Sequence, residues 1–378
     1  MSALRRFTLS LAAAVVFTLG SVISGGPALA QQGGVYLTAS GYRVPVYGAS
    51  LVVNAEGRVG TSCAQLTDQQ IESLRFTRSV SRSMMTSYPR STVQATADVT
   101  AAKCEIIYTD AAGTGFSDPA QGPARRRAME ATVAAWSAVI QGTVPIVIQA
   151  RMEAPTDPAS MTLASAGPVD FSSIDGRLVP SALASQLRGG RSGASAVDIE
   201  VVVNPTVDWD YAVNGAAAPN KASFVYTMIH EVGHGLGFLS TFELESGAML
   251  NPLPTPYDVF VNRSSRGGSP LTSRSTEQVK EDLTSGDLFF SGPKTTEASA
   301  RSIRPMPMVK LYAPKPYEQG SSTSHVDQET YADFKVGLMT PRDFGSGTDK
   351  IDILTLGVME DMGDKLVPDA VTARLPNR

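Results

Sequence analysis

The stretch HEVGHGLG, residues 230–237, decides how this chain is read. Two histidines four residues apart on a helix point the same way and can bind one metal ion through their imidazole nitrogens. Glu231 lies too far round the helix to be a ligand, yet close enough to act as general base on a zinc-activated water. The chain contains only three histidines. The spacing of two of them predicts a zinc-dependent hydrolase.

The helix that carries this motif is expected to be amphipathic. Between residues 225 and 236 the apolar side chains fall in one sector of a helical wheel, and the two histidines fall near the opposite side. We therefore expect one face to pack on a sheet and the other to face a cleft. Gly233 costs about 1 kcal/mol relative to Ala, which is expected where a backbone or a substrate approaches closely. Gly237 predicts the turn that ends the helix.

Residues 230–237 resemble the metzincin zinc-binding sequence, which in compact members has a third histidine at the position where this chain has Ser240. The remaining histidine, His325, lies in GSSTSHVD at 320–327 and is followed by GLMTP at 337–341. This arrangement resembles the leishmanolysin-type metzincins, in which an insertion precedes the third histidine and a Met-turn follows. The resemblance implies that the zinc ligands are His230, His234 and His325. It also implies that Glu231 is the base and that Met339 is the apolar floor under the imidazoles.

A set of short motifs in a fixed order resembles a group of secreted bacterial metzincin-like proteins. The motifs stand at residues 257–260, 311–314, 324–327, 338–341 and 356–363, and the likeness spans residues 105 to 365. It implies an α+β, metzincin-like zincin fold. A twisted mixed sheet with a backing helix and the zinc helix would be followed by an irregular C-terminal subdomain that ends in a helix.

Other acidic residues near these motifs have alternative roles. Glu243 or Glu245 could be the third ligand in place of His325, in a site of two histidines and one glutamate. Asp258 and Asp327 are expected as hydrogen-bonding partners, including of an imidazole. The Asp-rich stretch at 208–210 could hold calcium, but a solvated loop explains it and calcium is unsupported. No tyrosine follows Met339 in the turn, so zinc itself would have to polarise the substrate carbonyl.

Strands and helices alternate before the zinc helix. Strands are expected at residues 105–109, 144–152 and 198–203, and helices near 68–80 and after Pro123. The second helix carries an apolar stripe of Met129, Val133, Trp136 and Ile140, with Gly142 as its stop. A closing helix is expected at 353–362. This order predicts a sheet backed by helices.

The first thirty residues have the build of a secretory signal peptide, with Arg5 and Arg6, an apolar run over 7–23 and a cleavage site at 28–30. The alternative is a membrane anchor, but the run contains Thr, Ser and Gly and is short for a span. We therefore expect a secreted or periplasmic protein with no membrane partner after cleavage.

The two cysteines, Cys63 and Cys104, predict a disulfide in an exported chain. The alternative is that one of them is a thiolate that caps the zinc from a propeptide. Residues 31–104 form an N-terminal extension or a removable propeptide in this interpretation. Two catalytic subdomains follow, 105–240 with the zinc helix and 241–378 with the third histidine and the Met-turn.

Composition restricts the function further. A net charge of −4 argues against nucleic acid as a partner, and 42% hydrophobic residues are enough for a sizeable core. A serine-hydrolase elbow, a P-loop and a dinucleotide fingerprint are missing from the sequence. We predict a monomeric zinc metalloendopeptidase acting on a protein or peptide. The alternatives are an exported binding or adhesion protein on a zinc-stabilised scaffold and a zinc hydrolase of non-peptide amides.

Overall fold

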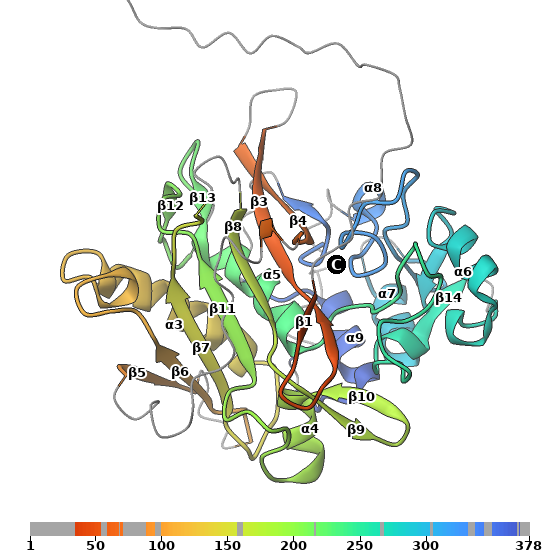
Figure 1. Cartoon of the computed structure of the whole chain (residues 1–378), viewed down its shortest axis with the longest axis horizontal. Coiled ribbons are helices and arrows are strands. Elements are labelled where there is room, and N and C mark those ends of the chain that lie inside the picture. The colour runs from red at the N-terminus through yellow and green to blue at the C-terminus, as the bar shows by residue number, and fades with distance from the viewer. Residues whose placement is uncertain are drawn as a thin grey trace, which may run out of the picture. The chain divides into compact units, whose positions relative to one another are not determined.

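The largest feature of the fold is an eight-stranded mixed sheet, in the order β17-β4-β3-β8-β11-β7-β6-β5 (Figure 1). In chain order its strands are β3 (Tyr47–Val53), β4 (Val59–Gln65), β5 (Arg90–Val93), β6 (Cys104–Tyr108), β7 (Ile146–Met152), β8 (Thr162–Pro168), β11 (Ile199–Val203) and β17 (Arg342–Asp343). The computed structural model describes residues 35–53, 59–67, 69–70, 88–94, 100–156, 162–214, 217–264, 268–302, 305–331, 337–343, 350–368 and 370.

The centre of the sheet is parallel and its outer strands are antiparallel. β6, β7 and β11 run parallel to one another, whereas β8 pairs antiparallel with β11 and β3 pairs antiparallel with β8. Every residue of β7, β8 and β11 is buried. Strands buried on both faces are mostly apolar, and the IEVVV run of β11 is apolar except for Glu200, which forms a buried ion pair with Arg151 of β7.

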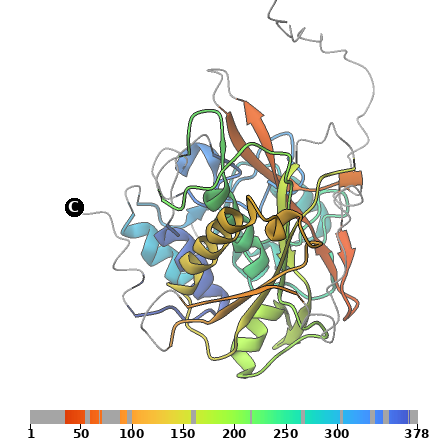
Figure 2. The ribbon, with the colours of Figure 1, turned by 90° about the vertical axis from the view of Figure 1, so that its left-hand side faces the viewer.

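Two helices pack against one another and against one face of the sheet. Helix α3 (Gly122–Ser137) contacts α5 (Phe224–Leu236), and α5 lies along β8, β11 and β3 (Figure 2). The predicted stripe of α3 belongs to the main core, although the helix ends before Ile140, which pairs with Leu366. The predicted face of β7 joins the same core.

On the opposite face of the sheet the apolar clusters are smaller, and one of them is formed by Val46, Leu66 and Val202. The shorter elements beside the sheet are β1 (Val35–Leu37), β2 (Arg43–Pro45), β9 (Phe171–Ile174), β10 (Arg177–Pro180) and α4 (Ser181–Arg188), and Leu183 of α4 belongs to the main core. β1 pairs with β2 and β9 pairs with β10, both antiparallel. The sheet is therefore a buried layer with covering on both sides.

The C-terminal part is less regular. After β12 (Trp209–Asp210), β13 (Ala222–Ser223) and α5, a three-stranded sheet is formed by β14 (Val261–Arg263), β15 (Leu288–Phe290) and β16 (Val309–Lys310). The helices here are α6 (Thr276–Asp282), α7 (Pro293–Ala300), α8 (Gln328–Tyr331) and α9 (Ile353–Met362). Single 3-10 turns occur at Gly115–Ser117, Asp258–Phe260 and Leu271–Ser273. In Figure 1 most of this region lies on the far side of β3 and β4 from β7 and β11.

The mixed α+β class and the closing helix agree with the sequence predictions, as do the strands β6, β7 and β11. The hairpin β3–β4, the strand β8 and the elements β9, β10 and α4 were missed. The expected leader lies outside the described residues, and so does the helix expected near 68–80 over all but its first few positions. In the described part of the chain, no helix is both long and apolar enough to cross a membrane.

Candidate metal centre

Helix α5 is defined by its caps and by complete burial. It begins after Ser223, whose hydroxyl accepts a hydrogen bond from the backbone N–H of Tyr226, and it ends at Gly237 with φ +117°. Only glycine adopts such a backbone readily, so Gly237 is the predicted stop. All thirteen residues of the helix are buried, including both histidines. The open cleft expected on the histidine face is therefore absent from the described structure, because the β3–β4 hairpin covers that face.

The three histidines of the chain meet at one point. The Nε2 atom of His234 lies 3.1 Å from that of His230 and 3.2 Å from that of His325, and the His230–His325 distance is also 3.2 Å. Two nitrogens bound to one tetrahedral zinc at about 2.0–2.1 Å lie about 3.3 Å apart. The triangle of nitrogens thus has the size that a single zinc ion requires.

The other nitrogen of each ring makes a hydrogen bond to a backbone carbonyl. Nδ1 of His230 donates to Leu338 at 2.7 Å, Nδ1 of His234 to Phe238 at 2.6 Å, and Nδ1 of His325 to Ser321 at 2.9 Å. Because a carbonyl cannot donate, each Nδ1 carries the proton and each Nε2 is left with a lone pair. Three lone pairs that converge repel one another unless a cation lies between them.

Burial reinforces the neutral state of these rings. It lowers the pKa of His230 to about 4 and holds the pKa values of His234 and His325 well below the usual 6.5. Imidazole binds a metal only when it is neutral. The site therefore offers three nitrogen ligands at neutral pH without a competing proton.

Cys63 occupies the remaining side of the cluster. Its Sγ lies 3.5 Å from Nε2 of His234, and the four donor atoms all lie within 4.8 Å of one another. Cys63 and Cys104 are both free and buried, so the predicted disulfide is wrong. Strand pairing explains this outcome, because β4 carries Cys63 to the histidines while β6 holds Cys104 in the main core.

Tyr47 is a further contributor that the sequence analysis missed. Its ring stacks on that of His234 with centroids 4.6 Å apart and an interplanar angle of 17°. Its hydroxyl donates to the carbonyl of Ser240 at 3.1 Å and shares a hydrogen bond of 2.6 Å with the hydroxyl of Ser324. Ser240, in the place of the compact metzincin's third ligand, donates its backbone N–H to the same Ser324 hydroxyl. This network links α5 to the segment of His325.

Glu231 lies beside the cluster and has no ordinary partner. Its side chain is fully buried, and neither carboxylate oxygen makes a hydrogen bond within the described residues. Burial raises the pKa of Glu231 to about 8, and the nearby Cys63 thiol and the backbones of Ala166 and Ala49 partly oppose this rise without forming hydrogen bonds to the carboxylate. A cavity of about 10 Å³, room for about one water, borders Glu231, His230 and Cys63.

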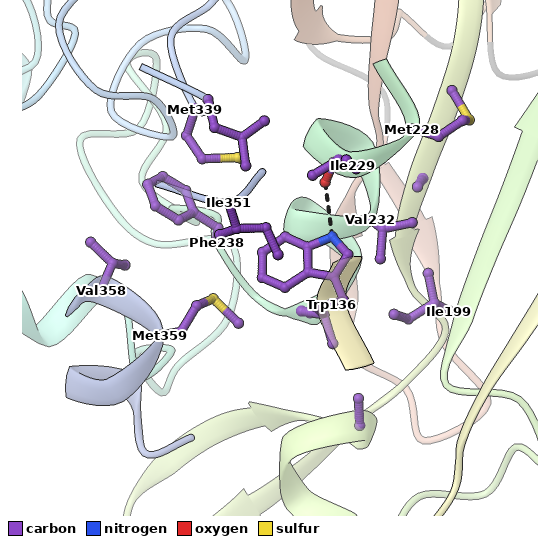
Figure 3. Packing of buried hydrophobic residues seen from close by; sticks show 14 of the residues in the cluster. Trp136, Ile199, Met228, Ile229, Val232, Phe238, Met339, Ile351, Val358 and Met359 are labelled. Carbon is purple, nitrogen blue, oxygen red and sulfur yellow. Dashed lines mark hydrogen bonds between the residues drawn. The ribbon is translucent and has the colours of Figure 1, made fainter. Parts of the chain in front are cut away.

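Met339, which the resemblance places under the imidazoles, lies beside α5 at Gly233. A Cβ atom on Gly233 would come within 3.1 Å of Sδ of Met339 and 3.2 Å of the ring of Trp136. Figure 3 shows these two side chains against α5, with the indole N–H of Trp136 bonded to the carbonyl of Ile229. The groups that closely approach Gly233 are thus side chains of the core.

The other acidic candidates lie elsewhere. Asp258 accepts hydrogen bonds from Ser240, Thr241 and Thr255, and Asp327 binds Thr330 and Lys310. Neither contacts an imidazole, because backbone carbonyls hold the rings. Glu243 and Glu245 are not part of the four-residue cluster. In the Asp-rich stretch, Trp209 and Asp210 form β12 rather than a loop, Asp208 pairs with Lys221, and Asp210 accepts hydrogen bonds from two backbone amides.

The donor set fits zinc, which accepts imidazole and thiolate ligands in tetrahedral geometry. Comparison with known proteins adds no further constraint: family models, curated proteins and solved structures all give no match to this chain. The chemistry of the site therefore has to be argued from its own geometry.

Proposed function

We propose that this chain is an exported, zinc-dependent endopeptidase of metzincin-like fold. The observation that carries the proposal is the meeting of three Nε2 lone pairs beside Glu231, a buried carboxylate without a hydrogen-bond partner. His230, His234 and His325 would hold the metal. When bound there, zinc lowers the pKa of a water and polarises a substrate carbonyl.

Residues of the chain itself would carry out the proton transfers and orient the metal ligands. Glu231 is positioned to accept a proton from the attacking water on a carboxylate oxygen and to pass it to the departing amide nitrogen. The carbonyls of Leu338, Phe238 and Ser321 orient the imidazoles, and Met339 packs against α5 at Gly233. A peptide is the proposed substrate because a Lewis acid and a base placed side by side can hydrolyse an unactivated amide.

A second candidate is favoured by Cys63. Structural zinc sites have four protein ligands, whereas catalytic sites leave one position open. With Cys63 the cluster reaches four donors. An exported binding protein with a structural zinc would account for this, although such a protein has no chemical need for Glu231.

The two candidates are separated by replacing Glu231 with glutamine. We expect Glu231→Gln to retain zinc and to lose hydrolysis of casein by about 10²–10⁴-fold, the range associated with a general acid–base group. Glu245→Gln, in the loop after the helix, is the matched control and should keep both. Because Cys63 covers the fourth position, each variant is assayed with Cys63 present and as Cys63→Ser. Chelator-resistant hydrolysis, or undiminished hydrolysis by Glu231→Gln, would contradict the proposal.

A further inference from the structure

The segment that carries His325 contains a strained residue. Thr323 has φ +72°, in the left-handed region, and its fully buried Oγ1 has no hydrogen-bond partner within the described residues. A β-branched side chain is rarely found in this region, because its Cβ crowds the backbone. The other non-glycine residues with positive φ in the described ranges, Asp175, Asn220 and Ser264, are neither buried nor β-branched. Strain of this kind persists only where surrounding contacts impose it.

Two hydrogen bonds impose this conformation on Thr323. Its backbone N–H donates to the carbonyl of Tyr312 at 2.7 Å, and its carbonyl accepts from the hydroxyl of Tyr257 at 2.9 Å. The N–H of Tyr312 in turn donates to the carbonyl of His325 at 2.9 Å. Each tyrosine stands in one of the ordered sequence motifs, and the sequence alone assigns neither a role. In the structure both hold the turn that precedes the third histidine.

The side chain of Tyr257 is itself fixed by the core. It is fully buried, and its ring contacts those of Phe238 and Phe290 with centroid distances of 5.2 and 5.0 Å. The carbonyl of Phe238 accepts the hydrogen bond that orients the ring of His234. Because an aromatic ring packed in this way has little freedom, its hydroxyl fixes the turn at Thr323 relative to the segment that orients His234.

Thr323 affects the metal centre through His325, two residues later. Nδ1 of His325 donates to the carbonyl of Ser321 at 2.9 Å, so the hydrogen bond that orients this ring spans the strained residue. A change of φ at Thr323 would move Ser321 relative to His325 and turn Nε2 of His325 away from the other two histidines. Since three converging lone pairs repel one another, the zinc-free protein would gain from such a relaxation unless the turn were held.

We propose that Tyr257 is a positioning residue for the metal centre: through the carbonyl of Thr323 it holds the turn before His325 in a strained conformation that is ready to bind metal. This inference rests on the metal site of the proposed function and not on the hydrolytic step. Without the hydroxyl of Tyr257, Thr323 relaxes in the zinc-free protein, and zinc binding has to restore the strained turn. The free energy of that strain is then lost from the zinc affinity.

Zinc competition against a chromophoric chelator measures this coupling. We expect Tyr257→Phe, which keeps the packed ring, to raise the zinc dissociation constant about tenfold, as groups that orient a metal ligand do. The same substitution should again cost about tenfold in Thr323→Ala, where the left-handed strain remains, but at most about threefold in Thr323→Gly, where it is absent. An equal loss in both backgrounds would overturn the proposal, and so would an unchanged affinity in Tyr257→Phe.

Urea unfolding of zinc-free Thr323→Ala and Thr323→Gly tests the strain itself, even if Tyr257→Phe fails to fold. Both variants delete the hydroxyl and the methyl group of Thr323. Glycine is ordinarily the less stable of the two. Here we expect Thr323→Gly to be the more stable, with a folding equilibrium constant about fivefold higher, because only glycine adopts this φ without strain. The ordinary order would overturn the proposal.

The wild-type protein separates failure of this inference from failure of the proposed function. If the wild type bound no stoichiometric zinc, the proposed function and the positioning role would both be overturned. Stoichiometric zinc binding that does not respond to Tyr257→Phe would overturn the positioning role alone.

Discussion

Removal of the hydroxyl of Tyr47 is the most direct test of how the N-terminal hairpin supports the metal centre. Tyr47→Phe keeps the ring that stacks on His234 but deletes two hydrogen bonds, one to Ser324 and one to Ser240. Both partners are buried. The substitution therefore leaves the packing in place and isolates the polar link to the segment that carries His325.

The expected cost follows from those two bonds. Each contributes about 0.5–1.5 kcal/mol net, so Tyr47→Phe should lower the free energy of unfolding by about 1–3 kcal/mol. Part of this loss should appear as weaker zinc binding, because Ser324 directly precedes the proposed ligand His325. Groups that orient metal ligands are worth about 10–100-fold in affinity. We expect a zinc dissociation constant about tenfold higher, equivalent to about 1.4 kcal/mol.

The assay is urea unfolding of zinc-loaded and chelator-treated protein, together with zinc competition against a chromophoric chelator. Tyr108→Phe is the matched control, because its buried hydroxyl has no hydrogen-bond partner within the described chain and its removal should be neutral or slightly stabilising. The destabilisation of Tyr47→Phe should be larger with zinc than without it. Unchanged zinc affinity in Tyr47→Phe, or the same free energy of unfolding in Tyr47→Phe and Tyr108→Phe, would refute the reasoning.

Other substitutions probe separate parts of the molecule. His325→Ala should lose stoichiometric zinc by metal analysis; full occupancy would overturn the three-histidine site. Gly235→Ala places Cβ 2.5 Å from the side chain of Ile199 and should cost about 1–3 kcal/mol in urea unfolding. Gly233→Ala, whose Cβ would lie 3.1 Å from Sδ of Met339 and 3.2 Å from the ring of Trp136, needs smaller shifts and should cost less; the reverse order would contradict the packing. Burial raises the pKa of Asp364 from 3.8 to about 7, so its stabilising protonated form is lost as pH rises through 7. Between pH 4 and pH 8, the free energy of unfolding of Asp364→Asn should therefore rise relative to that of the wild type by up to about 4 kcal/mol. A difference between the two proteins that stays constant across that range would exclude this cause.

Local patterns in the sequence were sufficient for much of the fold. The stripe on α3, the apolar runs of β7 and β11 and the capped helix α5 each follow from spacing within one segment. β8 was missed because its sequence, TLASAGP, is small and buried on both faces, so no alternation of apolar and polar residues marks it. α4 and the β9–β10 hairpin are likewise too short to give a strong periodic signal.

The metal centre shows the same division between local and distant information. His230, Glu231 and His234 are set by one helix, and the resemblance supplied His325. Cys63 and Tyr47 reach the site through strand pairings with residues that lie far along the chain, such as that of β3 with β8 and of β4 with β17. A single sequence gives no register for such pairings. For that reason a hairpin covers the histidine face where a cleft was expected, and Cys63 lies as a free thiol beside the three histidines instead of in the predicted disulfide.

The two candidate functions make different demands on the fourth position. Four protein ligands alone would favour a structural zinc, but that function leaves Glu231 buried beside the metal with neither oxygen hydrogen-bonded, an arrangement that costs free energy unless water or substrate joins it. A peptidase with a permanently bound Cys63 is equally inconsistent, because the metal would have no free position for the water on which the base acts. Both features serve one molecule only if Cys63 can leave the site. The activity of Cys63→Ser therefore decides between a structural zinc and a catalytic zinc whose fourth position Cys63 covers.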